Sequence, residues 1–126
     1  ETLDTIGKMW NENKYLMDTH TAVAYKVYED YVAETGDETP AVIASTASAY
    51  KFAESAAKAL GLDENKVRVL AGTSADVTGF DYMKALEKET GVKIPAGLRG
   101  LEEKPVLHKN VCSAEAMAEA VMDALK

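Results

Sequence analysis

The spacing of apolar residues predicts two helices in the first third of the chain. The first covers residues 2–13, where apolar side chains return every three or four positions. The second follows Asp18 or Thr19, either of which can cap its first turn, and stops at Gly36. An apolar stripe runs along this helix, and we expect the face formed by Tyr25, Tyr28 and Tyr31 to pack on something, with a neighbouring domain as one candidate. This stripe comprises Val23, Val27, Tyr28, Tyr31 and Val32.

Three further helices are predicted in the rest of the chain. One covers residues 49–60 and is closed by Gly61, and another runs from Gly79 to a stop at Gly91. The last is an amphipathic helix over residues 113–126, and a loop with one helical turn is predicted before it, at 94–105.

Three short segments have the character of strands. Residues 41–45, "AVIAS", are apolar at nearly every position, as in a strand covered on both faces of a parallel sheet. Residues 66–72 are consistent with a short strand, and 106–111 alternate between apolar and polar as a half-exposed strand does. With helices on both sides, these strands predict a single α/β domain over residues 1–126. We expect a three-layer α/β/α arrangement around a partial sheet.

Composition and charge narrow the classes of function. The formal net charge is −7, and acidic and basic residues are interspersed, so there is no basic face for nucleic acid or for an anionic membrane. Cys112 is the only cysteine and has no partner for an internal disulfide, which favours a reducing, cytoplasmic location. The chain begins at Glu1 without an initiator Met, and we expect it to be a piece of a longer protein.

The junction "STAS", residues 45–48, is the first candidate site. It follows the predicted strand and opens the next helix, where unpaired backbone N–H groups and the helix dipole attract an anion. Thr46 and Ser48 can hydrogen-bond a ligand there. The alternative is that one of these hydroxyls only caps the helix.

His20 and Lys51 are weaker candidates taken singly. His20 lies in the first turn of a predicted helix, where it either faces a ligand or makes one backbone hydrogen bond. Lys51 either pairs with an anion near the junction or belongs to a solvated face. The two histidines and one cysteine show no spacing typical of metal ligands, so no metal site is predicted.

Two stretches of the sequence resemble the C-terminal part of threonine synthases. They are "DTHTAVAYKVYEDYVAETGDETPAVIASTASAYKF" and the later "TGVKIPAGLRGLEEKPV". The resemblance is strong over residues 1–61 and weaker over 79–126, and residues 62–78 resemble nothing recognisable.

The resemblance implies a function and a set of site residues. Threonine synthases use pyridoxal 5′-phosphate to convert O-phospho-L-homoserine and water to L-threonine and phosphate, on a fold similar to that of the tryptophan synthase β subunit. The resemblance implies that Thr46, with Ser45 beside it, faces the pyridine nitrogen of the cofactor. His20 and Thr21 would lie on the substrate side, and Lys51 would help to bind the anion.

The resemblance also implies what this chain lacks. The Schiff-base lysine and the loop that holds the cofactor phosphate belong to the earlier part of these enzymes, and nothing here matches either. We therefore expect a C-terminal fragment that is inactive alone, contains no catalytic residue and can self-associate. The alternative is a free-standing α/β module that binds a small anion at the helix start of residues 45–48.

Overall fold

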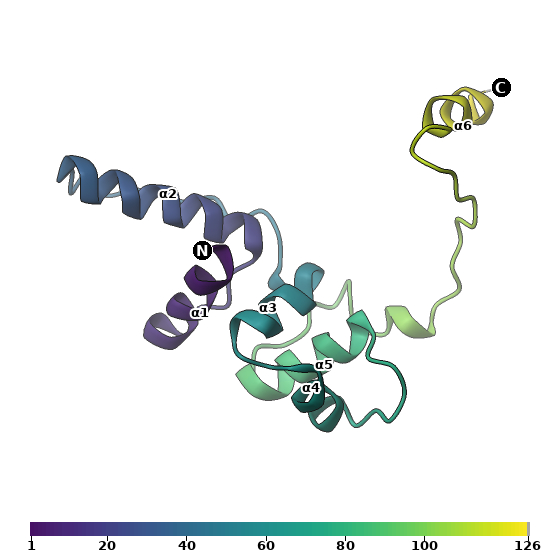
Figure 1. Cartoon of the computed structure of the whole chain (residues 1–126), viewed down its shortest axis with the longest axis horizontal. Coiled ribbons are helices and arrows are strands. Elements are labelled where there is room, and N and C mark those ends of the chain that lie inside the picture. Colours follow the sequence, from purple (N-terminus) through teal and green to yellow (C-terminus); the bar gives the residue numbers. More distant parts are fainter. Residues whose placement is uncertain (126) are drawn as a thin grey trace.

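The computed structural model describes residues 1–125, and every regular element within that range is a helix (Figure 1). Helices α1 (Thr2–Asn13) and α2 (Thr19–Thr35) form a pair at the N-terminal end. A 3₁₀ turn, η1 (Ala49–Phe52), leads into α3 (Ala53–Ala59), which packs with α4 (Glu64–Ala71) and α5 (Gly79–Thr90). A second 3₁₀ turn, η2 (Leu101–Glu103), precedes the last helix, α6 (Met117–Ala124).

The helices begin and end where the sequence provides caps. The predicted first helix is confirmed over Thr2–Asn13, and the second is confirmed with Asp18 as its N-cap and Gly36 as its C-cap. Helix α5 opens with a capping box between Thr78 and Asp81, which was not predicted, and is closed by the left-handed Gly91, which was. These local signals act within one turn of chain, so they hold whatever the rest of the fold is.

The predicted α/β fold is wrong, because residues 1–125 contain no strand. Residues 41–45 and 106–111 form no strand, and Val42 and Val111 are 98% and 94% exposed. A strand needs the backbone groups of a neighbour, and in the described chain no segment supplies them. The three-layer arrangement therefore has no sheet to be built on.

The third predicted strand, at 66–72, is helix α4. Asp63 accepts a hydrogen bond from the backbone N–H of Lys66, at 2.8 Å, and Gly72 ends the helix in the left-handed conformation. Val67 is fully buried while Val69 is 81% exposed, although an alternating strand would place both on one face. The cap at Asp63 and the stop at Gly72 are the signals that the strand interpretation overlooked.

The core has two parts that meet at α3. The larger part lies among η1, α3, α4 and α5. Within it the Tyr50 hydroxyl donates a hydrogen bond to the carbonyl oxygen of Val92, which joins η1 to the segment after α5. The smaller part lies between α1 and α2 and contains Ile6, Met17 and Ala22. Leu60 packs against both, so α3 connects the two halves of the fold.

The last segment of the chain lies apart from this core. In Figure 1 an extended stretch leads away from η2 and ends in α6. The apolar side chains of α6 are exposed, and the helix starts at Met117, later than predicted. Residue 126, the last of the predicted helix, lies outside the described residues.

One close contact sets the distance between α1 and α3. A Cβ atom built on Gly7 would lie 2.7 Å from the carbonyl oxygen of Ala59, a separation that real Cβ atoms essentially never show. The missing side chain at Gly7 is therefore what allows the two helices to approach.

Gly7→Ala is predicted to lower the free energy of unfolding by about 1–3 kcal/mol, the usual cost of inserting an atom into packed structure. Helix propensity alone predicts the opposite sign, a gain of up to about 1 kcal/mol. Gly79→Ala is the matched control, since nothing lies within 4 Å of a Cβ atom there. Urea denaturation would measure both, and a Gly7→Ala protein as stable as the Gly79→Ala protein would contradict the close packing.

Candidate functional site

A chain of three polar side chains joins the start of α2 to the junction at residues 45–48. Asp18 accepts hydrogen bonds from the backbone N–H groups of His20 and Thr21 through its Oδ1 atom, at 2.9 and 3.4 Å. Its other oxygen, Oδ2, is hydrogen-bonded to the Thr21 hydroxyl. Thr21 Oγ1 lies 3.0 Å from Ser45 Oγ, a contact across 24 residues of sequence. We call Asp18, Thr21 and Ser45 the hydroxyl chain.

The hydroxyl chain runs from the interior to the surface. The Asp18 side chain has no exposed surface, Thr21 is buried, and Ser45 is exposed. Burial of a carboxylate is unfavourable unless donors surround it, and here the cap N–H groups and the Thr21 hydroxyl are those donors. One end of the chain is thus fixed, and the other end is open to a ligand.

The imidazole of His20 contacts the same carboxylate. Its Nδ1 atom lies 3.2 Å from Asp18 Oδ1, and its ring lies 5.0 Å from that of Phe52 between centroids, tilted by 57°. An ionised carboxylate only accepts, so Nδ1 holds the hydrogen in this contact and Nε2 takes no part in it. The side chain is 69% exposed and accessible to a ligand.

Burial by itself raises the pKa of the Asp18 carboxyl, and the hydrogen bonds from the Thr21 hydroxyl and from the two backbone N–H groups lower it. The net result is an Asp18 pKa below its ordinary value. Asp18 is therefore ionised at neutral pH, and its charge stabilises the fold under those conditions.

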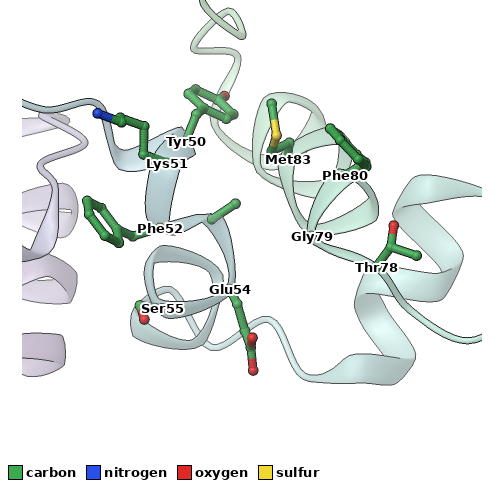
Figure 2. Close-up of a pocket in the computed structure, with 10 residues that line it drawn as sticks. Tyr50, Lys51, Phe52, Glu54, Ser55, Thr78, Gly79, Phe80 and Met83 are labelled. Atoms are coloured by element: carbon green, nitrogen blue, oxygen red, sulfur yellow. The ribbon is translucent and has the colours of Figure 1, made fainter. Parts of the chain in front are cut away.

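The other predicted site residues lie close by in sequence but serve different roles. Thr46 is exposed next to Ser45. The Ser48 hydroxyl accepts from the backbone N–H of Tyr50, at 3.3 Å, and so caps η1, which is the second of the two readings of this junction. Lys51 is exposed, and in Figure 2 its side chain points away from Phe80 and Met83.

Sequence reasoning recognised Asp18 only as a cap for α2. The signal for its further role is the pattern Asp-x-x-Thr, which places a hydroxyl within reach of the free carboxylate oxygen one turn later. That pattern does not reveal the contact with Ser45, because Ser45 comes from a separate segment.

A cavity of about 580 Å³ lies between the η1–α3 segment and the start of α5 (Figure 2). Phe52 and Glu54 line one side of it, and Thr78, Phe80 and Met83 line the other. Phe52 also contacts His20, so this ring lies between the cavity and the hydroxyl chain.

The part of the chain that the structure describes offers neither a metal cluster nor a membrane-spanning helix. Within residues 1–125, no three His, Cys, Asp or Glu side chains come together as ligands for a metal ion. No helix in the same range has the length and apolar character that crossing a bilayer requires.

Asp18→Ala is predicted to lower the free energy of unfolding at pH 7 by about 1–2 kcal/mol, because α2 loses its cap. Asp63→Ala, at the exposed cap of α4, should lower the free energy of unfolding by less.

The effect of Asp18 on stability is predicted to depend on pH. Since the pKa of Asp18 is lowered in the folded state, the stabilisation by Asp18 is complete above the unfolded pKa of about 3.9. It is lost as the pH falls through the folded value, and the difference between wild type and Asp18→Ala should shrink there. Urea denaturation at pH 7 and pH 3 would measure this, and a difference that is independent of pH would contradict it.

Comparison with known proteins agrees with the resemblance seen in the sequence. A protein-family model described as "Threonine synthase, C-terminal" matches residues 21–124. The match includes Thr21, Ser45 and Thr46, and it also spans residues 62–78, which had resembled nothing recognisable. A search of curated proteins gave no match. Because the family match covers most of the chain, the chain belongs to the threonine synthase C-terminal family.

Proposed function

We propose that this chain is the C-terminal part of a threonine synthase that converts O-phospho-L-homoserine and water to L-threonine and phosphate. The observation that supports this is the family match over residues 21–124, which includes the exposed hydroxyls at Ser45 and Thr46. Pyridoxal 5′-phosphate, when bound, supplies an electron-withdrawing ring that stabilises negative charge on the reacting carbons.

The residues present fit one edge of such a cofactor. Thr46 and Ser45 place two neighbouring hydroxyls at the surface, and the Ser45 hydroxyl is held by Thr21 at 3.0 Å. We propose that Thr46 faces the ring nitrogen and that Ser45 lies beside it. A hydroxyl fixed in advance loses little conformational entropy when a ligand binds, which favours this position as one wall of a site.

The substrate-side assignments follow from the same placement. His20 has an exposed ring whose Nε2 is not used in the contact with Asp18, so this nitrogen can accept a hydrogen bond from a bound molecule. Lys51 is the cation nearest in sequence to the junction and is exposed, as the attraction of a substrate phosphate requires. Thr21 acts through Ser45, because it is buried.

The alternative, an anion-binding module at residues 45–48, receives less support. It was expected on an α/β framework, and the described residues have no sheet. The Ser48 hydroxyl already caps η1, and a turn of four residues offers little of the dipole that draws an anion to a long helix.

Thr46→Ala in the full-length protein is predicted to reduce turnover, or affinity for pyridoxal 5′-phosphate, by about 10- to 100-fold. This is the effect of losing one hydrogen bond to a charged or strongly polar group, about 1.5–3 kcal/mol. Steady-state kinetics and cofactor titration would measure it. Ser74→Ala, on an exposed loop, is the control and should behave as wild type. Wild-type turnover in Thr46→Ala would remove Thr46 from the site.

The 126-residue chain alone is predicted to release no phosphate from O-phospho-L-homoserine, even with pyridoxal 5′-phosphate added. The reason is that the lysine expected to hold the cofactor belongs to the part of these enzymes that this sequence does not match. A phosphate-release assay with the full-length protein as positive control would test this. Turnover by the chain alone would show that its own residues suffice.

A further inference from the structure

The hydroxyl chain has a direction, which follows from counting protons. The Thr21 hydroxyl has a single proton but two oxygen neighbours, Asp18 Oδ2 and Ser45 Oγ. An ionised carboxylate can only accept, so the contact between Thr21 and Asp18 requires the Thr21 proton. The contact between Thr21 and Ser45 is then made by the proton of Ser45. The protons are ordered from Ser45 to Thr21 to Asp18.

This order determines what Ser45 can offer to a ligand. Its single proton is directed inward to Thr21, so only the lone pairs of Ser45 Oγ face the surface. A bound oxyanion, such as a phosphate or carboxylate, would meet those lone pairs without a proton between them. An N–H or O–H group would find an acceptor.

We propose that Asp18 is a positioning residue that makes Ser45 a hydrogen-bond acceptor, so that Ser45 recognises an N–H or O–H donor on the bound molecule. This rests on the proposed function only for the identity of that molecule. The donor belongs either to the pyridine ring of the cofactor or to the amino group of the substrate or product. The phosphate of the substrate binds elsewhere.

The two carboxylate oxygens of Asp18 have separate roles, which makes Asp18→Asn an informative change. Oδ1 accepts from the backbone N–H groups of His20 and Thr21, whereas Oδ2 meets the Thr21 hydroxyl. An asparagine that keeps the cap with its oxygen must place its NH₂ group against Thr21. Thr21 then accepts from the amide and donates to Ser45, and the Ser45 proton turns outward. Replacing one carboxylate oxygen of Asp18 by an NH₂ group therefore reverses the proton order of the hydroxyl chain while the helix cap is kept.

The proton order can be tested without any ligand. Neutron diffraction from deuterated crystals of the 126-residue chain would locate the hydroxyl deuterons. In the wild type we expect the Ser45 deuteron between Ser45 Oγ and Thr21 Oγ1, and in Asp18→Asn we expect it to point to solvent. Asp63→Asn, at an exposed cap that has no hydroxyl chain, is the matched control and should leave Ser45 unchanged. A wild-type Ser45 deuteron that points to solvent would overturn the proposal.

The class of ligand is tested in the full-length protein, loaded with pyridoxal 5′-phosphate labelled with ¹⁵N in the ring or with ¹⁵N-labelled L-threonine, the proposed product. The ¹⁵N chemical shift reports the hydrogen bond of each nitrogen. A shift change in Asp18→Asn at the ring nitrogen assigns the donor to the cofactor, and a change at the amino nitrogen assigns it to the substrate side. A change at neither nitrogen would overturn the recognition role of Ser45. The proposed function would then still stand or fall with Thr46→Ala.

Two variants of Thr21 keep the test decisive if Asp18→Asn does not fold. Thr21→Val removes the hydroxyl within nearly the same volume and should produce a ¹⁵N shift change. Thr21→Ser keeps the hydroxyl and should restore the wild-type shift. If Thr21→Val leaves both ¹⁵N shifts as in the wild type, the chain from Asp18 to Ser45 has no effect on the ligand and the proposal fails.

Discussion

The buried carboxylate of Asp18 is the constraint around which the N-terminal half of the molecule is arranged. A charge without exposed surface needs a full set of donors, and Asp18 receives them from the first turn of α2, from Thr21 and from His20. Those donors fix where α2 begins and which way Thr21 points. Through Thr21 they also fix Ser45, which otherwise lies in an extended segment with no strand partner.

Helices α1, α2 and α5 could be predicted because their signals are local, whereas α4 was interpreted as a strand although its cap and stop are local too. Asp18, Thr78 and the closing glycines act within a single turn, and the predicted boundaries of α1, α2 and α5 are those observed. The strands could not be settled in this way, because an apolar run such as 41–45 becomes a strand only if another segment pairs with it. Nothing within residues 1–125 pairs with it, and the composition of the run does not contain that information.

The residues of the candidate site could be predicted from the sequence, but the contacts among them could not. His20, Thr46 and Lys51 were candidates from the sequence itself, and a family resemblance added Thr21 and Ser45. The structure joins Thr21 to Ser45 and His20 to Asp18. What joins them is a buried carboxylate that was recognised from the sequence only as a helix cap. An aspartate that only caps a helix and one that also holds a distant hydroxyl have the same sequence pattern. They can be told apart only in the folded structure, where residues 45–48 lie close to the start of α2.

Phe52 has a consequence that extends beyond its packing. The ring lines the cavity beside α5 on one side and supports the imidazole of His20 on the other. The two places therefore share one side chain. By thermodynamic linkage, a molecule that favoured one rotamer of Phe52 from the cavity would bias the orientation of His20, and a ligand at His20 would bias the shape of the cavity by the same free energy.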